Sequence, residues 1–275
     1  MNSIPFVKAQ ACGNDFLILE ETAAQGRHAQ LVRTLCARHT GVGADGIEFL
    51  EWRADGSFFL RLFNADGSEA ELSGNGTRCV AAWLAESEGL EEVALGTHGG
   101  VRMCRVVRRE AGVWWIESGM GVPRVMPRSI EIAGVPGVVE GVMVNVGNPH
   151  FVIFPEREDF GSHGMSWQEL GAKIAVAPLF KFGTNVEFVR VLKQDEIAFR
   201  IFERGCGPTT SSGTGTCASS AATITLKGVA RKLSAVAEGG AQGVEWPEAT
   251  AEMLLIGPAE IVCTGEARVD FELFL

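Results

Sequence analysis

The stretch FNADGSEAELSGNGTRC, residues 63–79, returns in outline later in the chain as FERGCGPTTSSGTGTCA, residues 202–218. Both copies start with Phe at the end of an apolar run, and both reach a Ser-Gly-x-Gly loop at the same spacing. Two more landmarks recur in the same order, since residues 13–16 return at 147–151 and residues 47–49 return at 186–188. Three ordered matches at nearly one spacing are hard to obtain by chance, so we infer an internal duplication.

Each copy is rich in short runs with strand character. These runs hold β-branched and aromatic residues and are bounded by Gly, Asn or Asp. They cover residues 16–20, 46–52, 57–63, 101–107 and 112–118 in the first copy, and 142–146, 150–154, 186–192 and 196–202 in the second. Helices are expected over residues 29–38, 77–87, 167–174 and 216–226. The pattern predicts an α+β fold of two similar, mostly β domains related by a pseudo-twofold axis.

The domain boundary is expected where Gly and Pro concentrate, near residues 118–128. This predicts a first domain over residues 1–118 and a second over 119–264. Residues 265–275 are a candidate final strand of the first domain. A ligand site served by both copies would receive an equivalent loop from each, and small-molecule sites are common at such places.

Charge and composition exclude several classes of function. The 275 residues carry 34 acidic against 24 basic side chains, a net charge of −10, which disfavours nucleic-acid binding. No uncharged apolar stretch is long enough to span a bilayer, and the N-terminus has no secretory pattern. Seven cysteines without a CxxC pair indicate neither a disulfide framework nor a metal site. We expect a cytoplasmic protein with no membrane or nucleic-acid partner, and the absence of Tyr excludes a tyrosine acid or base.

The two Ser-Gly-x-Gly loops are the strongest functional candidates. Turn glycines let backbone amides converge, and a following helix N-terminus favours an anion such as a carboxylate or a phosphate. The plainer interpretation is a glycine-rich helix start with Ser73 and Ser212 as N-caps. Their occurrence at matching places in both copies favours a ligand site.

The two loop segments and four shorter ones resemble those of a known family. Residues 63–79 resemble the first active-site signature of diaminopimelate epimerase, and residues 202–218 resemble the second. ACGNDF, GVGADG, VNVGNPHF and GTNVEFV, at residues 11–16, 41–46, 144–151 and 183–189, are similar to the remaining family blocks, in the family's order. The resemblance covers essentially the whole chain.

The resemblance implies both a fold and a reaction. The fold is two similar domains, each a mixed sheet wrapped as a barrel around a central helix. The reaction is inversion of LL- to meso-diaminopimelate for lysine and peptidoglycan precursors, without pyridoxal phosphate or any other cofactor. One base removes the α-proton from one face, and an acid returns a proton from the other. The implied partner is a small amino-acid substrate, and family members are often homodimers.

The chain departs from the family at the two bases. Both are cysteines in the family, whereas this chain has Ser73 and Ser212. A serine hydroxyl is a far weaker acid than a thiol and needs a partner to act as a base. His150 and Glu203, at positions thought to tune the bases, are the candidates, although each would otherwise be an ordinary structural residue. Three explanations stay open: a natural serine-bearing member, an engineered Cys→Ser form, or a protein that binds ligand without turnover.

The positions that bind substrate in the family are better preserved. Asn64, Asn185, Glu203 and Arg204 match those that hold the distal amino and carboxylate groups of diaminopimelate. Other matching ligand positions are Asn14, Gly74, Asn75, Asn148, Gly213 and Thr214. Gly46 and Pro208 depart from common family residues, which are Gln and an acidic residue.

Competing interpretations rest on weaker signals. Residues 41–46 fit GxGxxG, but the next residues predict a strand, where a dinucleotide site needs a helix. Residues 64–68 resemble a calcium loop without its full ligand spacing, and we expect a turn. A serine hydrolase or acyl transferase would use Ser212 as nucleophile and His150 as base, but no GxSxG elbow surrounds either serine. A ligand-binding protein without catalysis is the other alternative.

Overall fold

The computed structural model describes residues 2–274 and divides the chain into two compact units. The first unit contains residues 1–118 together with 257–275, and the second contains residues 119–256. The chain therefore re-enters the first unit at residue 257, whereas the sequence suggested 265.

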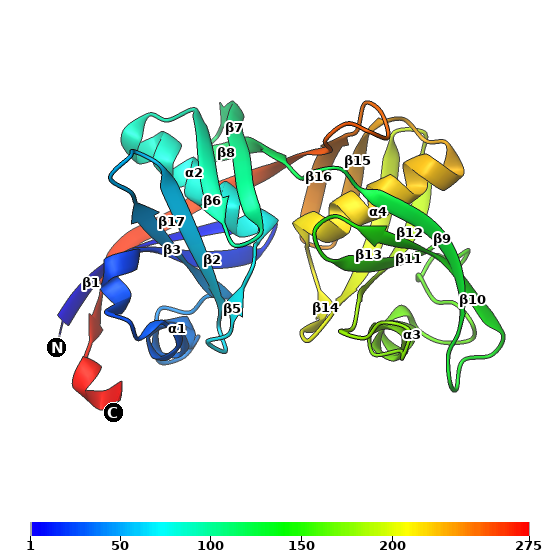
Figure 1. The fold of residues 1–275 in the computed structure, drawn as a ribbon, viewed down its shortest axis with the longest axis horizontal. Helices are drawn as coiled ribbons and strands as arrows, with labels where there is room; N and C mark the ends of the chain where they lie inside the picture. The colour runs from blue at the N-terminus through cyan, green and yellow to red at the C-terminus, as the bar shows by residue number, and fades with distance from the viewer. Residues whose placement is uncertain (1, 275) are drawn as a thin grey trace. The chain divides into compact units, whose positions relative to one another are not determined.

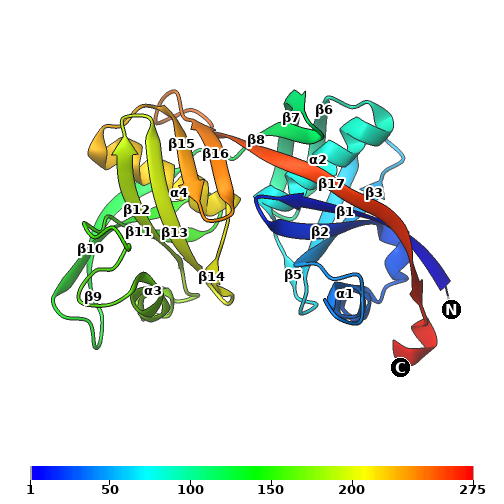
Figure 2. The ribbon, with the colours of Figure 1, turned by 180° about the vertical axis from the view of Figure 1, so that it is seen from behind.

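The first unit is a barrel of mixed strands. In spatial order its main strands are β1 (Asn2–Ala11), β2 (Asn14–Glu20), β3 (Gly46–Trp52), β4 (Phe58–Asn64), β6 (Glu92–Thr97), β7 (Gly100–Glu110), β8 (Val113–Gly119) and β17 (Leu254–Val269). A short strand, β5 (Glu69–Ala70), pairs with β4. The ring closes because β17 pairs with both β8 and β1, and Figure 2 shows β17 running beside β1. The pairs β2–β3 and β4–β6 are parallel.

Helix α2 (Gly74–Glu88) fills this barrel, and helix α1 (His28–Cys36) packs outside it (Figure 1). Strand β2 explains how both helices are held. Phe16 and Ile18 point into the cluster around α2, whereas Leu17 and Leu19 point into the cluster around α1. A strand that is covered on both faces is a continuous run of apolar residues, so this strand is easy to recognise in the sequence.

The second unit repeats this plan. Its strands are β9 (Arg124–Glu131), β10 (Val138–Asn145), β11 (Pro149–Ile153), β12 (Asn185–Lys193), β13 (Glu196–Glu203), β14 (Gly207–Thr209), β15 (Lys232–Ala237), β16 (Gly240–Glu245) and the start of β17. Helix α4 (Gly213–Lys227) lies in the core cluster, and α3 (Trp167–Ala175) packs on the outer face (Figure 1). The parallel pairs β11–β12 and β13–β15 match β2–β3 and β4–β6 of the first unit. The predicted barrel around a central helix is confirmed in both.

The strand register shows which residues are equivalent in the two units. In the first unit Phe16 pairs with Gly46, and in the second His150 pairs with Asn185. Phe16 therefore occupies the place that His150 has in the second unit. The interiors of the two units therefore differ, because one has a phenyl ring where the other has an imidazole.

Several element boundaries differ from the predicted ones. Helices α2 and α4 begin at Gly74 and Gly213, three residues before the predicted starts, because each serine caps the turn directly. The predicted strand over residues 265–275 is wrong beyond Val269: Asp270 accepts the Glu272 amide, and a 3-10 turn (η2) covers Phe271–Phe274. Leu275 lies outside the described residues.

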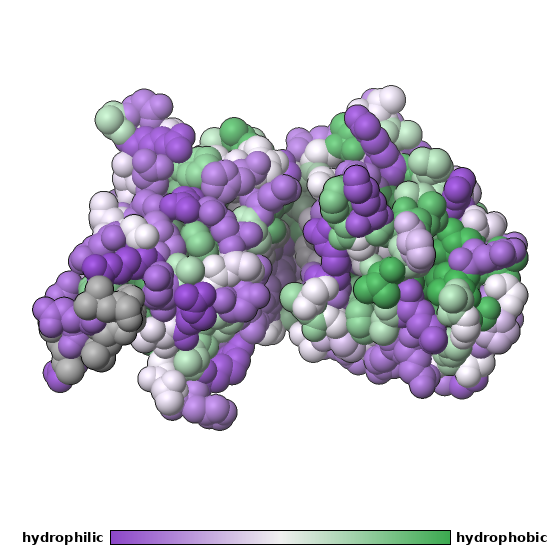
Figure 3. Space-filling model, turned by 60° about the horizontal axis from the view of Figure 1, so that its bottom comes forward, coloured by the Kyte–Doolittle hydropathy of each residue, from purple (hydrophilic) through white to green (hydrophobic). Residues whose placement is uncertain are grey.

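Two further features are the length of the helices and the apolar residues at the surface. Helices in the described part of the chain are all too short or too polar to cross a membrane. Hydrophobic areas reach the surface of the second unit, at the right of Figure 3, and exposed apolar side chains after α3 include Val176, Leu179 and Phe182.

Candidate active site

Ser73 stands at the start of α2 as its N-cap. Its backbone is extended (φ −121°, ψ 123°), and its Oγ accepts a hydrogen bond from the amide of Gly76 at 3.0 Å. The N-cap that the sequence offered as the plainer interpretation is therefore present. It does not oppose a ligand site, because a helix N-terminus that is capped in this way still favours an anion.

A polar chain orders the residues around this helix start. The guanidinium of Arg78, fully buried, donates to Asn75 Oδ1 at 2.6 Å and to the carbonyl of Gly74 at 3.1 Å. Asn75 Nδ2 donates to Asn14 Oδ1 at 3.2 Å, and Asn14 Nδ2 donates to Asp45 at 2.7 Å. Four predicted residues, Ser73, Gly74, Asn75 and Asn14, are thus gathered in one place, which we call the first half-site.

Asn64 lies at the end of β4 and is exposed. Its Nδ2 donates to Ser68 Oγ at 3.0 Å, within a turn in which Asp66 accepts the amide and hydroxyl of Ser68. This turn is the one expected for residues 64–68. The structure gives Asn64 contacts within the turn, so its role toward a ligand stays a prediction.

A buried carboxyl lies directly under the first half-site. Glu48 of β3 is 1% exposed, and a Cβ on Gly76 would overlap its Oε1. Gly76 is therefore required at this position: its amide holds Ser73 while its bare α-carbon makes room for Glu48. Burial raises the pKa of Glu48 to about 8.

The second half-site is built on the start of α4. Ser212 is the N-cap, and its Oγ accepts from the Gly215 amide at 3.2 Å and lies 3.4 Å from Thr214 Oγ1. Asn148 Nδ2 donates to Thr214 Oγ1 at 3.4 Å. The predicted residues Ser212, Gly213, Thr214 and Asn148 therefore meet at one helix start, as their counterparts do in the first unit.

His150 joins this site through Asn148. Its Nε2 lies 2.8 Å from Asn148 Oδ1, and its Nδ1 lies 2.6 Å from Oε1 of Glu187 on β12. His150 and Glu187 are both buried, and burial raises the pKa of Glu187. His150 thus reaches Ser212 through Asn148 and Thr214, and its ring nitrogens are occupied by other partners.

Glu203, Asn185 and Arg204 lie at the ends of β12 and β13. Burial raises the pKa of Glu203, although Thr209 Oγ1 donates to its Oε1 and partly opposes the shift. Asn185 Oδ1 accepts the backbone amide of Arg204 at 2.9 Å. The exposed Arg204 guanidinium donates to the carbonyl of Phe182 at 2.8 Å. The side chain predicted to bind a substrate carboxylate is therefore bonded to the backbone here.

The neighbouring cysteines do not replace the serines. Cys79 and Cys217 are fully buried in the two core clusters, and burial raises the pKa of the Cys79 thiol. Cys206 lies in the exposed turn between β13 and β14. The serines are the nucleophile-type side chains at both helix starts.

Sequence reasoning missed Glu48, Glu187 and Arg78. The signal for the two glutamates was present, since residues 47–49 and 186–188 are repeat landmarks with Glu at the centre. Nothing in a strand sequence says that a central Glu is buried, because its burial depends on α2 or α4 filling the inside of the barrel. Arg78 carries no pattern that distinguishes it from a surface arginine.

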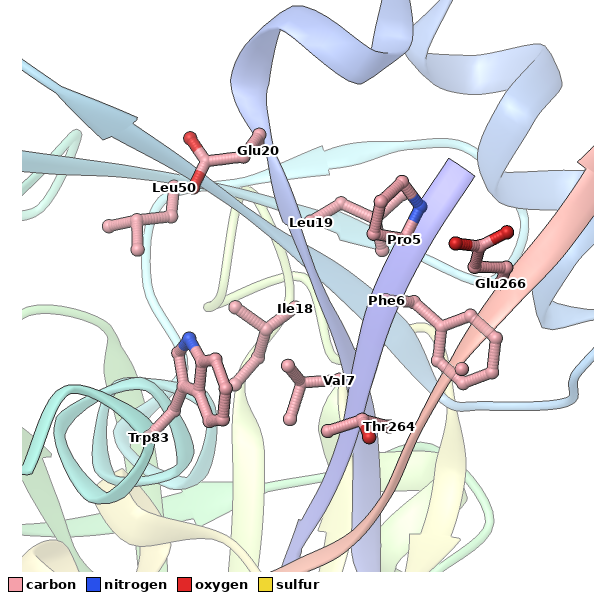
Figure 4. Close-up of a pocket in the computed structure, with 11 residues that line it drawn as sticks. Pro5, Phe6, Val7, Ile18, Leu19, Glu20, Leu50, Trp83, Thr264 and Glu266 are labelled. Atoms are coloured by element: carbon pink, nitrogen blue, oxygen red, sulfur yellow. The ribbon is translucent and has the colours of Figure 1, made fainter. Parts of the chain in front are cut away.

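A separate cavity of about 410 Å³ lies in the first unit, over β1, β2 and β17 (Figure 4). Its walls are Pro5, Phe6, Val7, Ile18, Leu19, Glu20, Leu50, Trp83, Thr264, Gly265 and Glu266. Figure 4 shows Trp83 of α2 facing Ile18 across it. It contains no residue of either half-site, so it is a distinct feature.

Comparison with known proteins shows which family this sequence matches. The family model described as diaminopimelate epimerase matches residues 6–126 and 142–268. A diaminopimelate epimerase of Pelotomaculum thermopropionicum is 36% identical over 278 residues, covering 95% of this chain and 98% of the relative. One from Bacteroides thetaiotaomicron is 35% identical, covering 96% and 97%.

Solved structures share the fold at low identity. A PhzF-family phenazine biosynthesis protein of Bacillus anthracis superposes with a TM-score of 0.73 at 16% identity, covering 98% of this chain and 100% of that one. A predicted epimerase of Pseudomonas aeruginosa gives 0.74 at 14% identity, with coverage of 97% and 100%. These likenesses show the fold, and the family model and relatives show the kinship: the chain belongs to the diaminopimelate epimerase family.

Proposed function

We propose that this protein is a cofactor-independent amino-acid epimerase that interconverts LL- and meso-diaminopimelate by two-base proton transfer. Its relatives carry the name of that reaction, and an epimerase-type isomerase is the class that they support. The observation that carries the proposal is the pair of serine-capped helix starts. Each combines a hydroxyl, converging amides and ordered Asn side chains.

The helix starts suit the charge that such a reaction creates. Removing the α-proton of an amino acid leaves a carbanion whose negative charge spreads onto the α-carboxylate. Backbone amides and the helix N-terminal dipole stabilise an anion there without reorganising. Glu203 and Arg204 supply opposite charges for the distal ammonium and carboxylate of a diamino dicarboxylic acid.

In this proposal Ser73 and Ser212 are the two acid–base groups. Each hydroxyl accepts an amide hydrogen bond, which favours its deprotonated form when a base draws the proton away. Each also has a buried glutamate in its own unit, Glu48 or Glu187. A lone serine hydroxyl needs a base to activate it, and these carboxyls are the candidates for that role.

The serine hydrolase alternative loses support at His150. A triad base must reach the nucleophile directly, yet the ring nitrogens of His150 are held by Asn148 and Glu187. A ligand-binding protein without turnover is the second candidate, favoured by the weak acidity of serine.

The test is α-proton exchange in D2O, followed by NMR with LL- and meso-diaminopimelate. Exchange with inversion of one isomer into the other supports the epimerase. Saturable binding without exchange supports the binding protein, and absence of both refutes the substrate. Labelling of Ser212 by a fluorophosphonate would favour the hydrolase.

A further inference from the structure

No partner among the described residues explains the burial of Glu48. It lies inside the barrel beside α2, 1% exposed, and its Oε1 has no hydrogen-bond partner among the described residues. Burying a carboxyl without a partner is costly, so such a group calls for an explanation.

Glu48 and Ser73 line the same small cavity. Its other walls are Leu60, Leu62, Glu71, Leu72, Thr77 and Thr97. The two threonine hydroxyls donate to backbone carbonyls, of Ser73 and Gly74 for Thr77 and of Gly100 for Thr97. Ser73 Oγ accepts from Gly76, and among the described residues its own proton has no backbone acceptor. Glu48 is thus the buried titratable group that shares a cavity with the Ser73 hydroxyl.

The second unit shows what the equivalent glutamate does with a partner. Glu187 follows the same repeat position, packs near Gly215, and bonds to His150. The first unit has Phe16 at the place of His150, so Glu48 lacks that base. Glu187 therefore has a hydrogen-bonding imidazole beside it, whereas Glu48 has a phenyl ring at that place.

We propose that Glu48 is the proton store of the first half-site and acts through Ser73. This inference rests on the proposed epimerase function. As the Ser73 O–H bond breaks and its proton forms the new Cα–H bond, the Glu48 side chain moves within hydrogen-bond reach of Ser73, its O–H bond breaks and its proton restores the Ser73 hydroxyl. In the reverse reaction the Cα–H bond breaks, Ser73 takes that proton, the serine proton passes to the Glu48 carboxylate, and the electron pair stays on the α-carbon.

The electrostatics around Glu48 agree with a donor. Burial raises its pKa to about 8, so the carboxyl is protonated at neutral pH and can give its proton up. The titratable groups nearby are the Cys79 thiol on α2 and Glu71 on the cavity wall. The guanidinium of Arg78, next along α2, is directed to Gly74 and Asn75.

The experiment compares the full-length protein with Glu48→Gln, Glu48→Asp and the control Glu71→Gln in the D2O exchange assay across pH. Glu48→Gln keeps the volume but cannot supply a proton, so turnover should fall by about 10²–10⁴-fold. It should still wash solvent deuterium into one isomer without inverting it, since the second half-site is intact. Glu48→Asp should restore part of the rate and move the alkaline limb of kcat/KM. Glu71→Gln should match the parent.

The outcomes separate this inference from the proposed function. If the parent protein turns over and Glu48→Gln keeps its rate, inversion and pH limb near 8, Glu48 is structural and the inference is overturned. If the parent itself shows neither exchange nor inversion, the proposed function fails and takes the inference with it. Loss of inversion with exchange of one isomer supports both.

Discussion

Nδ1 of His150 lies 2.6 Å from Oε1 of Glu187 in the interior of the second unit. The other ring nitrogen faces Asn148 Oδ1, an acceptor, when the amide is oriented to donate to Thr214. Nε2 must then carry a hydrogen, and the contact with Glu187 holds a single proton between carboxylate and imidazole. The two buried side chains therefore form one hydrogen-bonded pair.

His150→Ala should destabilise the protein by about 3–5 kcal/mol, because it leaves Glu187 buried without its partner. The loss should be smaller near pH 5 than near pH 8, since a lone carboxyl can then fold in its neutral form. Urea unfolding at both pH values measures this. The double variant His150→Ala/Glu187→Leu should recover part of the stability, and failure to do so would show that the histidine packs rather than pairs.

Glu48→Gln should stabilise the protein increasingly as pH rises. The pKa of Glu48 is raised from 4.5 to about 8 in the folded protein. Between these pH values the unfolded chain releases the proton and the folded protein keeps it, so the wild type loses stability as the pH rises. The difference between variant and wild type should grow by about 1.4 kcal/mol per pH unit over this window. Chemical denaturation from pH 4 to 9 gives the curve. A difference that stays constant with pH would mean that Glu48 titrates normally.

Gly76→Ala should cost about 1–3 kcal/mol, because the new methyl group must displace the Glu48 carboxyl. Removing that carboxyl should relieve the strain, so Gly76→Ala should cost less in a Glu48→Ala background. A double-mutant cycle from thermal or urea unfolding isolates the coupling. Additive effects would contradict the close approach of these two residues.

The double variant Ser73→Cys/Ser212→Cys should raise α-proton exchange by about 100-fold or more. A thiol ionises near pH 8.5 and lower at a helix N-terminus, so it is a far better acid–base group than a hydroxyl. D2O exchange by NMR measures the gain, with each single variant as the matched control. An unchanged rate in the double variant would show that the rest of the pocket has also diverged.

Strands covered on both faces were the most readable part of the sequence. The run GIEFLEW coincides with β3, because a strand between α1 and α2 needs apolar residues on both sides. Strands β15 and β16 escaped notice because Ala, Ser and Gly dominate them, and pairing with neighbours rather than propensity fixes their conformation.

The same limit applies to the candidate site. Both loops could be predicted, since small residues before a helix have a recognisable chemistry. The carboxyls beneath them could not, because a glutamate in a strand reads as solvent-facing until the packing of both faces is known. The contact of His150 with Glu187 likewise depends on a parallel strand pair, β11 with β12, that joins residues far apart in sequence.

Strand β17 has a consequence for how the chain acquires its structure. The second unit is continuous and spans residues 119–256, so all of it is synthesised before residues 257–269 of β17. The first unit lacks the partner of β1 and β8 until residues 257–269 arrive. On the ribosome the later-encoded barrel is thus the first that can close. The N-terminal barrel keeps two open edges, exposed to chaperones and to mispairing, until β17 has been synthesised.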